Sequence, residues 1–498
     1  MKNIIFRYLM TGALCLAAAA CYDVDDNGDT HALAPLSVGA VSDTINTLVN
    51  ETLHYEGLSV ENVRGEECTY TWVYGPRSTS ATSSDAFQSM TEISSSQTID
   101  YTFSKVGSFL LRLRVDNGES IAYKYFTLNV NAGFDEGLAI LSNDDEGEGH
   151  LSFIQTLTSE EAAVGKEDFI YSIFTPSSGS MKKVTTMALL DYASSSSTSS
   201  LFMIATNDDN GSIYNIDPST MELLSVSSMK SFGTCLETFA GDNAMSGGLI
   251  SAYFLSPERR VFKYDMNMLY ATEMDNMETL SEIKGIAYTF NRSSATGRNN
   301  MTPRLFSRDS VLSRYSASQG LRYLSEEGYE IVNACAARQR TSSTAMYYLL
   351  RSKTDPSSYK IMSGNYNGRT WNQVREFTSA EGVKMDSKSM FVNTLATNDV
   401  YYTYDNAIYH WGLSTPPGTS PAITLPQGET IVALATNIGG RGARTAGENL
   451  LYVLTYNPSR QGRKGSVYVY QFSDDTLVKA YEGVVDKPVA MLYKYRIS

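Results

Sequence analysis

Short runs of alternating apolar and polar residues, each ended by Gly, Asn, Asp or Pro, recur along this chain from about residue 36 to its end. Alternation with a period of two is typical of a β-strand that buries one face. The sequence has no amphipathic helical pattern of convincing length in this region. The pattern therefore predicts an all-β protein, and 33 tyrosines with many Ser, Thr, Gly and Asn fit that prediction.

The predicted strands form two groups that meet at a hinge, Ala132-Gly133. The first group, 36–132, contains a strand around Trp72, which we expect in the core, and a run at 99–115 that turns at 116–118 before a closing strand, 123–130. The aromatic strand at Trp72, the Tyr-x-Phe-x-x-x-Gly-x-Phe stretch from Tyr101 and the closing strand resemble the PKD (polycystic kidney disease) repeat. The resemblance implies an immunoglobulin-like β-sandwich.

The second group, 133–498, is a series of strand pairs with a repeated turn. Residues 143–147 (Asn-Asp-Asp-Glu-Gly) and 207–211 (Asn-Asp-Asp-Asn-Gly) share it, and 396–399 and 435–437 are weaker echoes. Such diverged repetition predicts a β-propeller of four-stranded blades, about seven in number at roughly 40–50 residues each. We expect the C-terminal strand at 484–494 to close the ring beside Gly137.

Residues 363–371 (Ser-Gly-Asn-Tyr-Asn-Gly-Arg-Thr-Trp) resemble a stretched Asp-box, the hairpin turn of sialidase-type propellers. In that family the box is structural, so the resemblance favours a propeller without implying hydrolysis.

The first thirty residues have the order of parts of an export signal. A cationic start is followed by an apolar stretch, 9–20, and three alanines precede Cys21. We expect a lipoprotein signal peptide at 1–20, acylation of Cys21 and an acidic tether at 21–35. The run from Asp23 to Asp29 resembles the tag that sends lipoproteins of the Bacteroidetes to the cell surface. The expected location is therefore the outer membrane, with the protein lipid-anchored and facing outward.

The same acidic run matches the first half of a calcium-binding EF-hand loop. The twelfth position, where that loop needs glutamate, is Ala34, and no helical pattern flanks the run. The four histidines are scattered without metal-ligand spacing, so we expect neither a metal nor a cofactor. Three cysteines, Cys68, Cys235 and Cys335, lie far apart, and whether any two pair is left open.

A net charge of −14 argues against nucleic acid and anionic headgroups as partners, because both require a basic surface. Beyond the signal, no apolar run approaches the roughly twenty residues of a membrane span.

The usual sequence marks of an enzyme are missing: there is no Gly-x-Ser-x-Gly, His-Glu-x-x-His or P-loop. Neighbouring carboxylates on one strand point to opposite faces and do not suit glycoside hydrolysis. We therefore expect no enzyme, although a Ser-His-Asp triad assembles in space and leaves no local motif.

Ligand binding is the expected activity, since aromatic rings at blade ends stack on sugars or peptide side chains. A glycine-rich loop also carries two arginines that suit an acidic ligand. The candidate ligand-binding residues are Trp411, Tyr409, Tyr401, Tyr347, Trp371, Arg441 and Arg444.

Taken together, the signal, the PKD-like unit and the strand at 137–142 resemble the PKD-like surface lipoproteins of Bacteroidetes. The resemblance implies an accessory of a SusC/SusD-type system, which captures an oligomeric nutrient, peptide or glycan, for an outer-membrane TonB-dependent transporter and its lid lipoprotein. Two alternatives remain open at this point: a scaffold that docks on the transporter without touching nutrient, and a propeller-type hydrolase of glycosides or peptides.

Overall fold

The computed structural model describes residues 35–494, apart from gaps of one or two residues and ten longer ones. The longer gaps are 77–89, 194–197, 241–250, 275–284, 293–298, 315–321, 339–343, 365–370, 394–398 and 438–449. The signal peptide, Cys21, Arg441 and Arg444 therefore lie outside the described residues. The chain divides into two compact units, Met1–Asn131 and Ala132–Ser498.

The all-β prediction is confirmed in the described part of the chain, where the helical elements are the short helix α3 (Ser159–Ala163) and the 3-10 turn η1 (Lys230–Phe232). Every other regular element there is a strand.

The first unit contains a five-stranded sheet and two strand pairs. The sheet has the order β2-β9-β8-β5-β6, in which β2 runs parallel to β9 and the other pairings are antiparallel. Its strands are β2 (Thr44–Leu48), β5 (Thr69–Pro76), β6 (Thr91–Ser94), β8 (Gly107–Asp116) and β9 (Ile121–Asn131). The two pairs are β1 (Leu36–Ala40) with β4 (Leu58–Asn62) and β3 (Thr52–Tyr55) with β7 (Ile99–Thr102).

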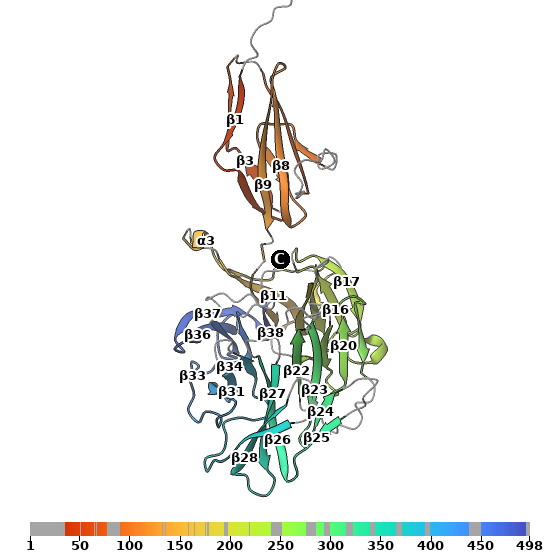
Figure 1. The fold of residues 1–498 in the computed structure, drawn as a ribbon, viewed down its shortest axis with the longest axis vertical. Helices are drawn as coiled ribbons and strands as arrows, with labels where there is room; N and C mark the ends of the chain where they lie inside the picture. The colour runs from red at the N-terminus through yellow and green to blue at the C-terminus, as the bar shows by residue number, and fades with distance from the viewer. Residues whose placement is uncertain are drawn as a thin grey trace, which may run out of the picture. The chain divides into compact units, whose positions relative to one another are not determined.

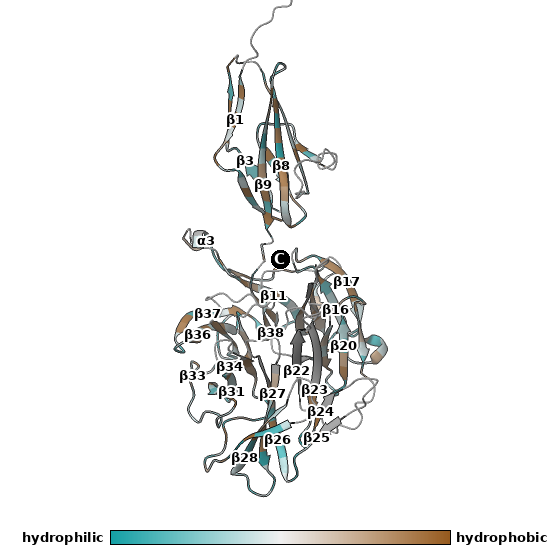
Figure 2. Ribbon diagram, in the orientation of Figure 1, coloured by the Kyte–Doolittle hydropathy of each residue, from teal (hydrophilic) through white to brown (hydrophobic). Residues whose placement is uncertain are grey.

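Trp72 lies at the centre of this unit, as its sequence context predicts. Its ring is fully buried beside Phe126, with 5.6 Å between ring centroids. The indole N–H donates a hydrogen bond to the carbonyl of Ser96 at 3.1 Å, so the polar edge of the ring is satisfied. Hydrophobic residues run along β8 and β9 (Figure 2), and alternate ones face this core.

The second unit contains seven sheets among its described residues. Six of them are four-stranded antiparallel meanders that follow one another along the chain. They comprise β14 (Val184–Ala193), β15 (Thr198–Thr206), β16 (Ser212–Ile216) and β17 (Leu223–Ser228); β18 (Thr238–Ala240), β19 (Ser251–Leu255), β20 (Val261–Asp265) and β21 (Tyr270–Glu273); β22 (Gly285–Arg292), β23 (Asn299–Phe306), β24 (Val311–Arg314) and β25 (Arg322–Leu324); β26 (Tyr329–Arg338), β27 (Thr344–Ser352), β28 (Ser358–Gly364) and β29 (Trp371–Thr378); β30 (Phe391–Asn393), β31 (Val400–Tyr404), β32 (Ala407–Trp411) and β33 (Ile423–Thr424); and β34 (Thr430–Thr436), β35 (Leu450–Tyr456), β36 (Gly465–Gln471) and β37 (Leu477–Val485).

The remaining sheet joins the two ends of the unit. Its order is β12-β11-β10-β38, where β10 (Gly137–Asn143), β11 (Glu148–Gln155) and β12 (Phe169–Ile170) come first in the unit and β38 (Lys487–Lys494) comes last. A short strand, β13 (Met181–Lys182), also pairs with β11. Figure 1 places the blue C-terminal strand beside the gold strands of this sheet. The prediction that the C-terminal strand pairs near Gly137 is confirmed.

The seven sheets form a closed ring. The first strands of the six meanders contact one another in chain order: β14, β18, β22, β26, β30 and β34. The C-terminal strand β38 contacts both β34 and β14 and so completes the circle. This arrangement is a β-propeller, and its hydrophobic clusters contain residues of adjacent sheets.

In the described part of the chain, two of the repeated Asn-Asp turns occupy matching places in their sheets. Residues 143–147 and 207–211 both join the second strand to the third, and the carboxylates of Asp144 and Asp208 accept backbone N–H bonds within the turn. The echo at 435–437 instead ends β34, the first strand of its sheet. Most of the echo at 396–399, and most of the resemblance to an Asp-box at 363–371, lies outside the described residues.

Candidate functional site

Three of the predicted ligand-binding aromatics, Trp411, Tyr409 and Tyr401, are packed inside the propeller. Trp411 is 0% exposed and donates its indole N–H to the carbonyl of Thr415 at 2.8 Å. Tyr409 is buried and stacks on Tyr402, with ring centroids 5.5 Å apart. These rings offer no surface to a ligand in this arrangement.

These rings are buried because each propeller sheet has a neighbouring sheet on both of its faces. Tyr401 and Tyr402 follow each other on β31 and therefore point to opposite faces. Alternation alone would leave one of the two rings facing away from the core, but both are buried. Tyr401 packs toward the last sheet and Tyr402 toward the preceding one, because an inner strand of a propeller is covered on both sides.

Tyr401 also has an internal partner for its hydroxyl. That group donates a hydrogen bond to Oδ1 of Asp475 at 2.6 Å, and burial, followed by this bond, raises the pKa of Tyr401 well above its usual range. Tyr347 is half-buried against the core between two sheets. Trp371 is half-buried against Tyr348, with 5.7 Å between ring centroids. Three of the five candidate aromatics are thus buried, and Tyr347 and Trp371 keep part of their surface exposed.

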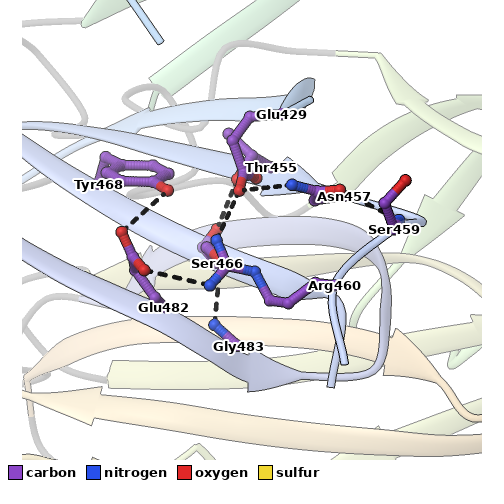
Figure 3. A network of polar contacts seen from close by, with 9 residues as sticks. All are labelled: Glu429, Thr455, Asn457, Ser459, Arg460, Ser466, Tyr468, Glu482 and Gly483. Carbon is purple, nitrogen blue, oxygen red and sulfur yellow. Dashed lines mark hydrogen bonds and ion pairs between the residues drawn. The ribbon is translucent and has the colours of Figure 1, made fainter. Parts of the chain in front are cut away.

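The most polar buried group of the last sheet is a network around Glu429 (Figure 3). Its carboxylate accepts hydrogen bonds from Thr455 at 2.6 Å and from Nη2 of Arg460 at 2.7 Å. Arg460 also bonds Glu482 at 3.1 Å, and Tyr468 donates to Glu482 at 3.5 Å. Burial, followed by the nearby carboxylates, raises the pKa of Tyr468 to about 12. Arg460 pairs with two carboxylates, whose charge is opposite to its own, so we interpret the network as one that stabilises the packing of the strands.

Exposed aromatic rings instead lie on the first unit, on the outer face of its five-stranded sheet. We call this surface the tyrosine face and define it by Ile121, Tyr123 and Tyr125 of β9 with Arg112 of β8. Ile121 is 50% exposed, Tyr123 49% and Tyr125 45%. The alternate residues of β9 point inward, and Phe126 and Leu128 among them are buried.

The rings of the tyrosine face form a platform. Tyr123 and Tyr125 stack with their centroids 6.5 Å apart and their planes at 26°. The guanidinium carbon of Arg112 lies 5.6 Å from the Tyr123 centroid, and in the strand register Arg112 stands opposite Tyr125. These tyrosines lie in the predicted closing strand, 123–130, and are not among the predicted ligand-binding residues. The signal that could have found them is two tyrosines two residues apart, just before the buried stretch of the strand.

Neighbouring charges on this sheet are paired. Arg114, opposite Tyr123, bonds the carboxylate of Asp116, and Lys124 bonds Asp43 at 2.5 Å. Two ring faces beside a guanidinium suit the stacking of a sugar ring or a planar side chain.

Among the described residues, no group of three His, Cys, Asp or Glu side chains is arranged to hold a metal ion. In the same part of the chain, no helix is both long enough and apolar enough to cross a membrane.

Comparison with known proteins gives distant structural likenesses. No family model matches the chain, and no curated protein matches it. A quinoprotein alcohol dehydrogenase-like protein from Bacteroides thetaiotaomicron is similar over 93% of this chain and 100% of its own, at 13% identity and a TM-score of 0.40. The β-propeller domain of Cps50 (Swd1) from Myceliophteria thermophila is similar over 58% of this chain and 83% of its own, at 10% identity and a TM-score of 0.33.

The WD40 domain of SCAP from fission yeast is similar over 52% of this chain and 57% of its own, at 12% identity and a TM-score of 0.29. These likenesses are too distant to bear on activity. The assignment of a propeller rests on the strand pairing and the closed ring of inner strands.

Proposed function

We propose that this chain is a surface lipoprotein that binds an oligomeric nutrient, a glycan or an oligopeptide, beside an outer-membrane TonB-dependent transporter and its lid lipoprotein. In this proposal the acyl chains on Cys21 hold it to the outer membrane, and the first unit is a PKD-like, immunoglobulin-like sandwich. The second unit is a seven-bladed propeller. The signal sequence, the acidic run after Cys21 and the resemblance of the first unit to PKD repeats support the proposal.

The tyrosine face is the observation that carries the binding role. Large aromatic rings are usually buried, and half-exposed rings stacked on a sheet suit recognition because they lose little conformational entropy on contact. Stacking on Tyr123 and Tyr125 tolerates different sugars or planar side chains, and Arg112 adds attraction for a carboxylate or an electron-rich ring. An oligomer spans two adjacent rings, and a monomer covers one.

The experiment is a binding screen of the full chain against panels of glycans and oligopeptides. We expect at least one class to bind, and the double variant Tyr123→Ala/Tyr125→Ala to lose about tenfold or more in affinity, since each ring stack contributes roughly 0.5–1.5 kcal/mol. Tyr270→Ala is the matched control, because Tyr270 is also 50% exposed but lies on β21 in the other unit. Equal binding by the double variant and the control would contradict the role of the tyrosine face.

The transporter partnership has a separate test. A tagged, lipidated form is extracted gently from the outer membrane, and the proteins that copurify are identified by mass spectrometry. Stoichiometric recovery of a transporter and its lid lipoprotein, lost in Cys21→Ala, is the expected result. Recovery of the chain alone would contradict a stable complex with the transporter and would leave the proposed binding role unaffected.

A docking scaffold is the second candidate function, and exposed apolar residues on outer strands favour it. Leu224 and Val226 are half-exposed on β17, which is the last strand of its sheet. Water-exposed apolar side chains on an edge strand suit contact with a protein surface. If Leu224→Ser/Val226→Ser abolishes copurification while nutrient binding is unchanged, the second unit is the docking element.

A further inference from the structure

Three side chains of the first propeller sheet stand in a row that the sequence does not reveal. Nδ1 of His150 lies 3.2 Å from the hydroxyl oxygen of Ser172, and Nε2 of the same ring lies 3.4 Å from Oδ2 of Asp144. A hydroxyl, an imidazole and a carboxylate in this order are the parts of a nucleophilic site.

Each member is held by a different element. Asp144 begins the turn between β10 and β11, and its Oδ1 accepts the backbone N–H groups of Glu146 at 3.0 Å and Glu148 at 2.7 Å. His150 lies on β11, and Ser172 follows β12. The second oxygen of Asp144 is therefore left facing the imidazole while the first fixes the turn.

The charge of Asp144 determines where the imidazole proton sits. Burial alone would raise the pKa of Asp144, but the backbone N–H of Glu148, the His150 side chain and the N–H of Glu146 outweigh it and hold that pKa below its usual range. An ionised carboxylate only accepts hydrogen bonds, so in the neutral tautomer that the site requires Nε2 carries the proton. Nδ1 is then the acceptor, and the donor to it is the Ser172 hydroxyl.

Ser172 has an unusual backbone conformation. Its φ of 55° lies in the left-handed region, which residues other than glycine seldom adopt. Such strain is common where a side chain must be presented at a functional site. The Ser172 N–H donates to the hydroxyl of Ser152 at 3.3 Å, which helps to hold the bend.

A cation lies beside the row. The guanidinium carbon of Arg463 is 3.4 Å from the ring centroid of Tyr171, the residue before Ser172. The Tyr171 hydroxyl donates to Asp486 at 2.6 Å, and the Tyr171 ring lies 5.1 Å from the His150 ring. Arg463 is 40% exposed, lies 4.0 Å from the carboxylate of Asp486 and donates to the carbonyl of Val484 at 3.4 Å, so its positive charge is shared with that carboxylate.

We propose that Ser172, His150 and Asp144 form an acyl-transfer site that hydrolyses small carboxylic esters. This goes beyond the proposed function, which requires no bond to be broken, and is independent of it. The side chains of His150 and Asp144 are 22% and 25% exposed and Ser172 is half-buried, so the row is partly exposed to solvent. The ring presents Nδ1 to the serine, whereas serine proteases present Nε2, but either order supplies one accepting and one donating nitrogen.

The reaction balances with water as the only co-reactant. The Ser172 oxygen bonds to the ester carbonyl carbon while its proton moves to Nδ1 of His150. The bond from that carbon to the alcohol oxygen then breaks, and the proton on Nδ1 goes to the departing alcohol. Water, deprotonated by the same nitrogen, attacks the acyl-serine, releases the carboxylic acid and restores the hydroxyl.

Covalent labelling tests the nucleophile directly. The full chain is treated with an alkyl fluorophosphonate, which leaves a phosphonyl group on an activated serine as fluoride departs. We expect the mass increase on the peptide that contains Ser172 and its absence in Ser172→Ala. Ser357→Ala is the matched control, because the Ser357 hydroxyl donates its hydrogen bond to a carboxylate, that of Asp355 at 2.7 Å, rather than to a histidine.

Turnover of p-nitrophenyl acetate gives the second readout. We expect Ser172→Ala and His150→Gln each to lower kcat/KM by about 10²-fold or more, and Ser357→Ala to leave it unchanged. Ser172→Gly removes the hydroxyl and relieves the backbone strain, so its inactivity with an unchanged melting temperature separates lost chemistry from misfolding. No labelling at Ser172, or turnover that survives both Ser172 variants, would overturn the proposal.

Discussion

Glu429 and Arg460 form an ion pair in which one partner is sealed from water and the other is not. The Glu429 side chain is 1% exposed, the Arg460 side chain is 23% exposed, and Oε1 of the first lies 2.7 Å from Nη2 of the second. Arg460 reaches Glu482 as well, and that carboxylate is 53% exposed. One guanidinium therefore joins a buried carboxylate to an exposed one within a single sheet.

This difference in burial predicts unequal losses in the free energy of unfolding for two similar variants. We expect Glu429→Gln to lower the free energy of unfolding by about 3 kcal/mol or more, because the bonds of a buried charge are lost. Glu482→Gln keeps the same geometry near water, and we expect a change within about 1 kcal/mol. Urea unfolding of both variants beside the wild type measures the difference. Equal costs would contradict the assignment of Glu429 as the centre of the network.

Burial of Trp411 predicts a stability defect for its removal. We expect Trp411→Ala to cost about 3–5 kcal/mol through loss of packing and of the bond to Thr415. Trp371 is half-buried, so Trp371→Ala should cost less. Chemical denaturation followed by circular dichroism measures both. A stable Trp411→Ala that loses ligand binding would instead support the original prediction of a ligand contact.

The two Asn-Asp turns contain glycines that differ in their surroundings. Gly147 (φ 81°) and Gly211 (φ 55°) occupy matching places, but a Cβ on Gly211 would lie 2.7 Å from the carbonyl oxygen of Thr234 and 2.9 Å from Cβ of Met229. A Cβ on Gly147 would meet Cγ of Lys183 at 3.8 Å, an ordinary contact.

We expect Gly147→Ala to cost roughly 1–2 kcal/mol, the strain of a left-handed residue. Gly211→Ala should cost distinctly more, because the clash with backbone adds to that strain. Thermal unfolding of the two variants compares them, and a smaller loss for Gly211→Ala would show that its turn shifts freely.

His54 predicts a pH dependence for the first unit. Its Nδ1 lies 2.5 Å from Asp100, across the β3–β7 pair, and its Nε2 lies 2.9 Å from Glu56. The hydrogen bond to Asp100, followed by that to Glu56, raises the pKa of His54 above 6.5. The imidazolium therefore stabilises the folded state fully below pH 6.5, and this contribution is lost as pH rises through the raised pKa.

Titration of the His54 ring protons by NMR measures that pKa directly. We expect Asp100→Asn to lower it toward 6.5. We also expect the wild type to lose more stability than His54→Gln between pH 6 and pH 8.5. A pKa at or below 6.5 in the wild type would contradict the contact.

Much of the fold follows from local pattern. The burial of Trp72 and the strand content are predictable, because alternation and turn residues act over a few positions. The pairing of the C-terminal strand with β10 follows from the repeated strand pattern, because a propeller closes its ring. The position of each aromatic ring does not follow from local pattern. Tyr401 and Tyr402 read as one inward and one outward residue, yet a neighbouring sheet covers each side of β31.

The candidate sites depend on contacts that no local pattern encodes. Ser172 meets His150 across 22 positions of the chain because β12 folds back on β11. The tyrosine face is evident only when the register sets Arg112 opposite Tyr125. The sequence supplied the residue types, and strand pairing between distant segments selected the partners.

The ring of the second unit closes only when β38 is present and paired with β10. Until Lys487–Lys494 have been synthesised, β10 presents an open edge from Gly137 to Asn143, and its hydrophobic side chains lack one neighbour. Open edges are the places where β proteins join to one another wrongly. Loss of β38 would therefore leave an edge on β10 that is free to pair with the wrong strand.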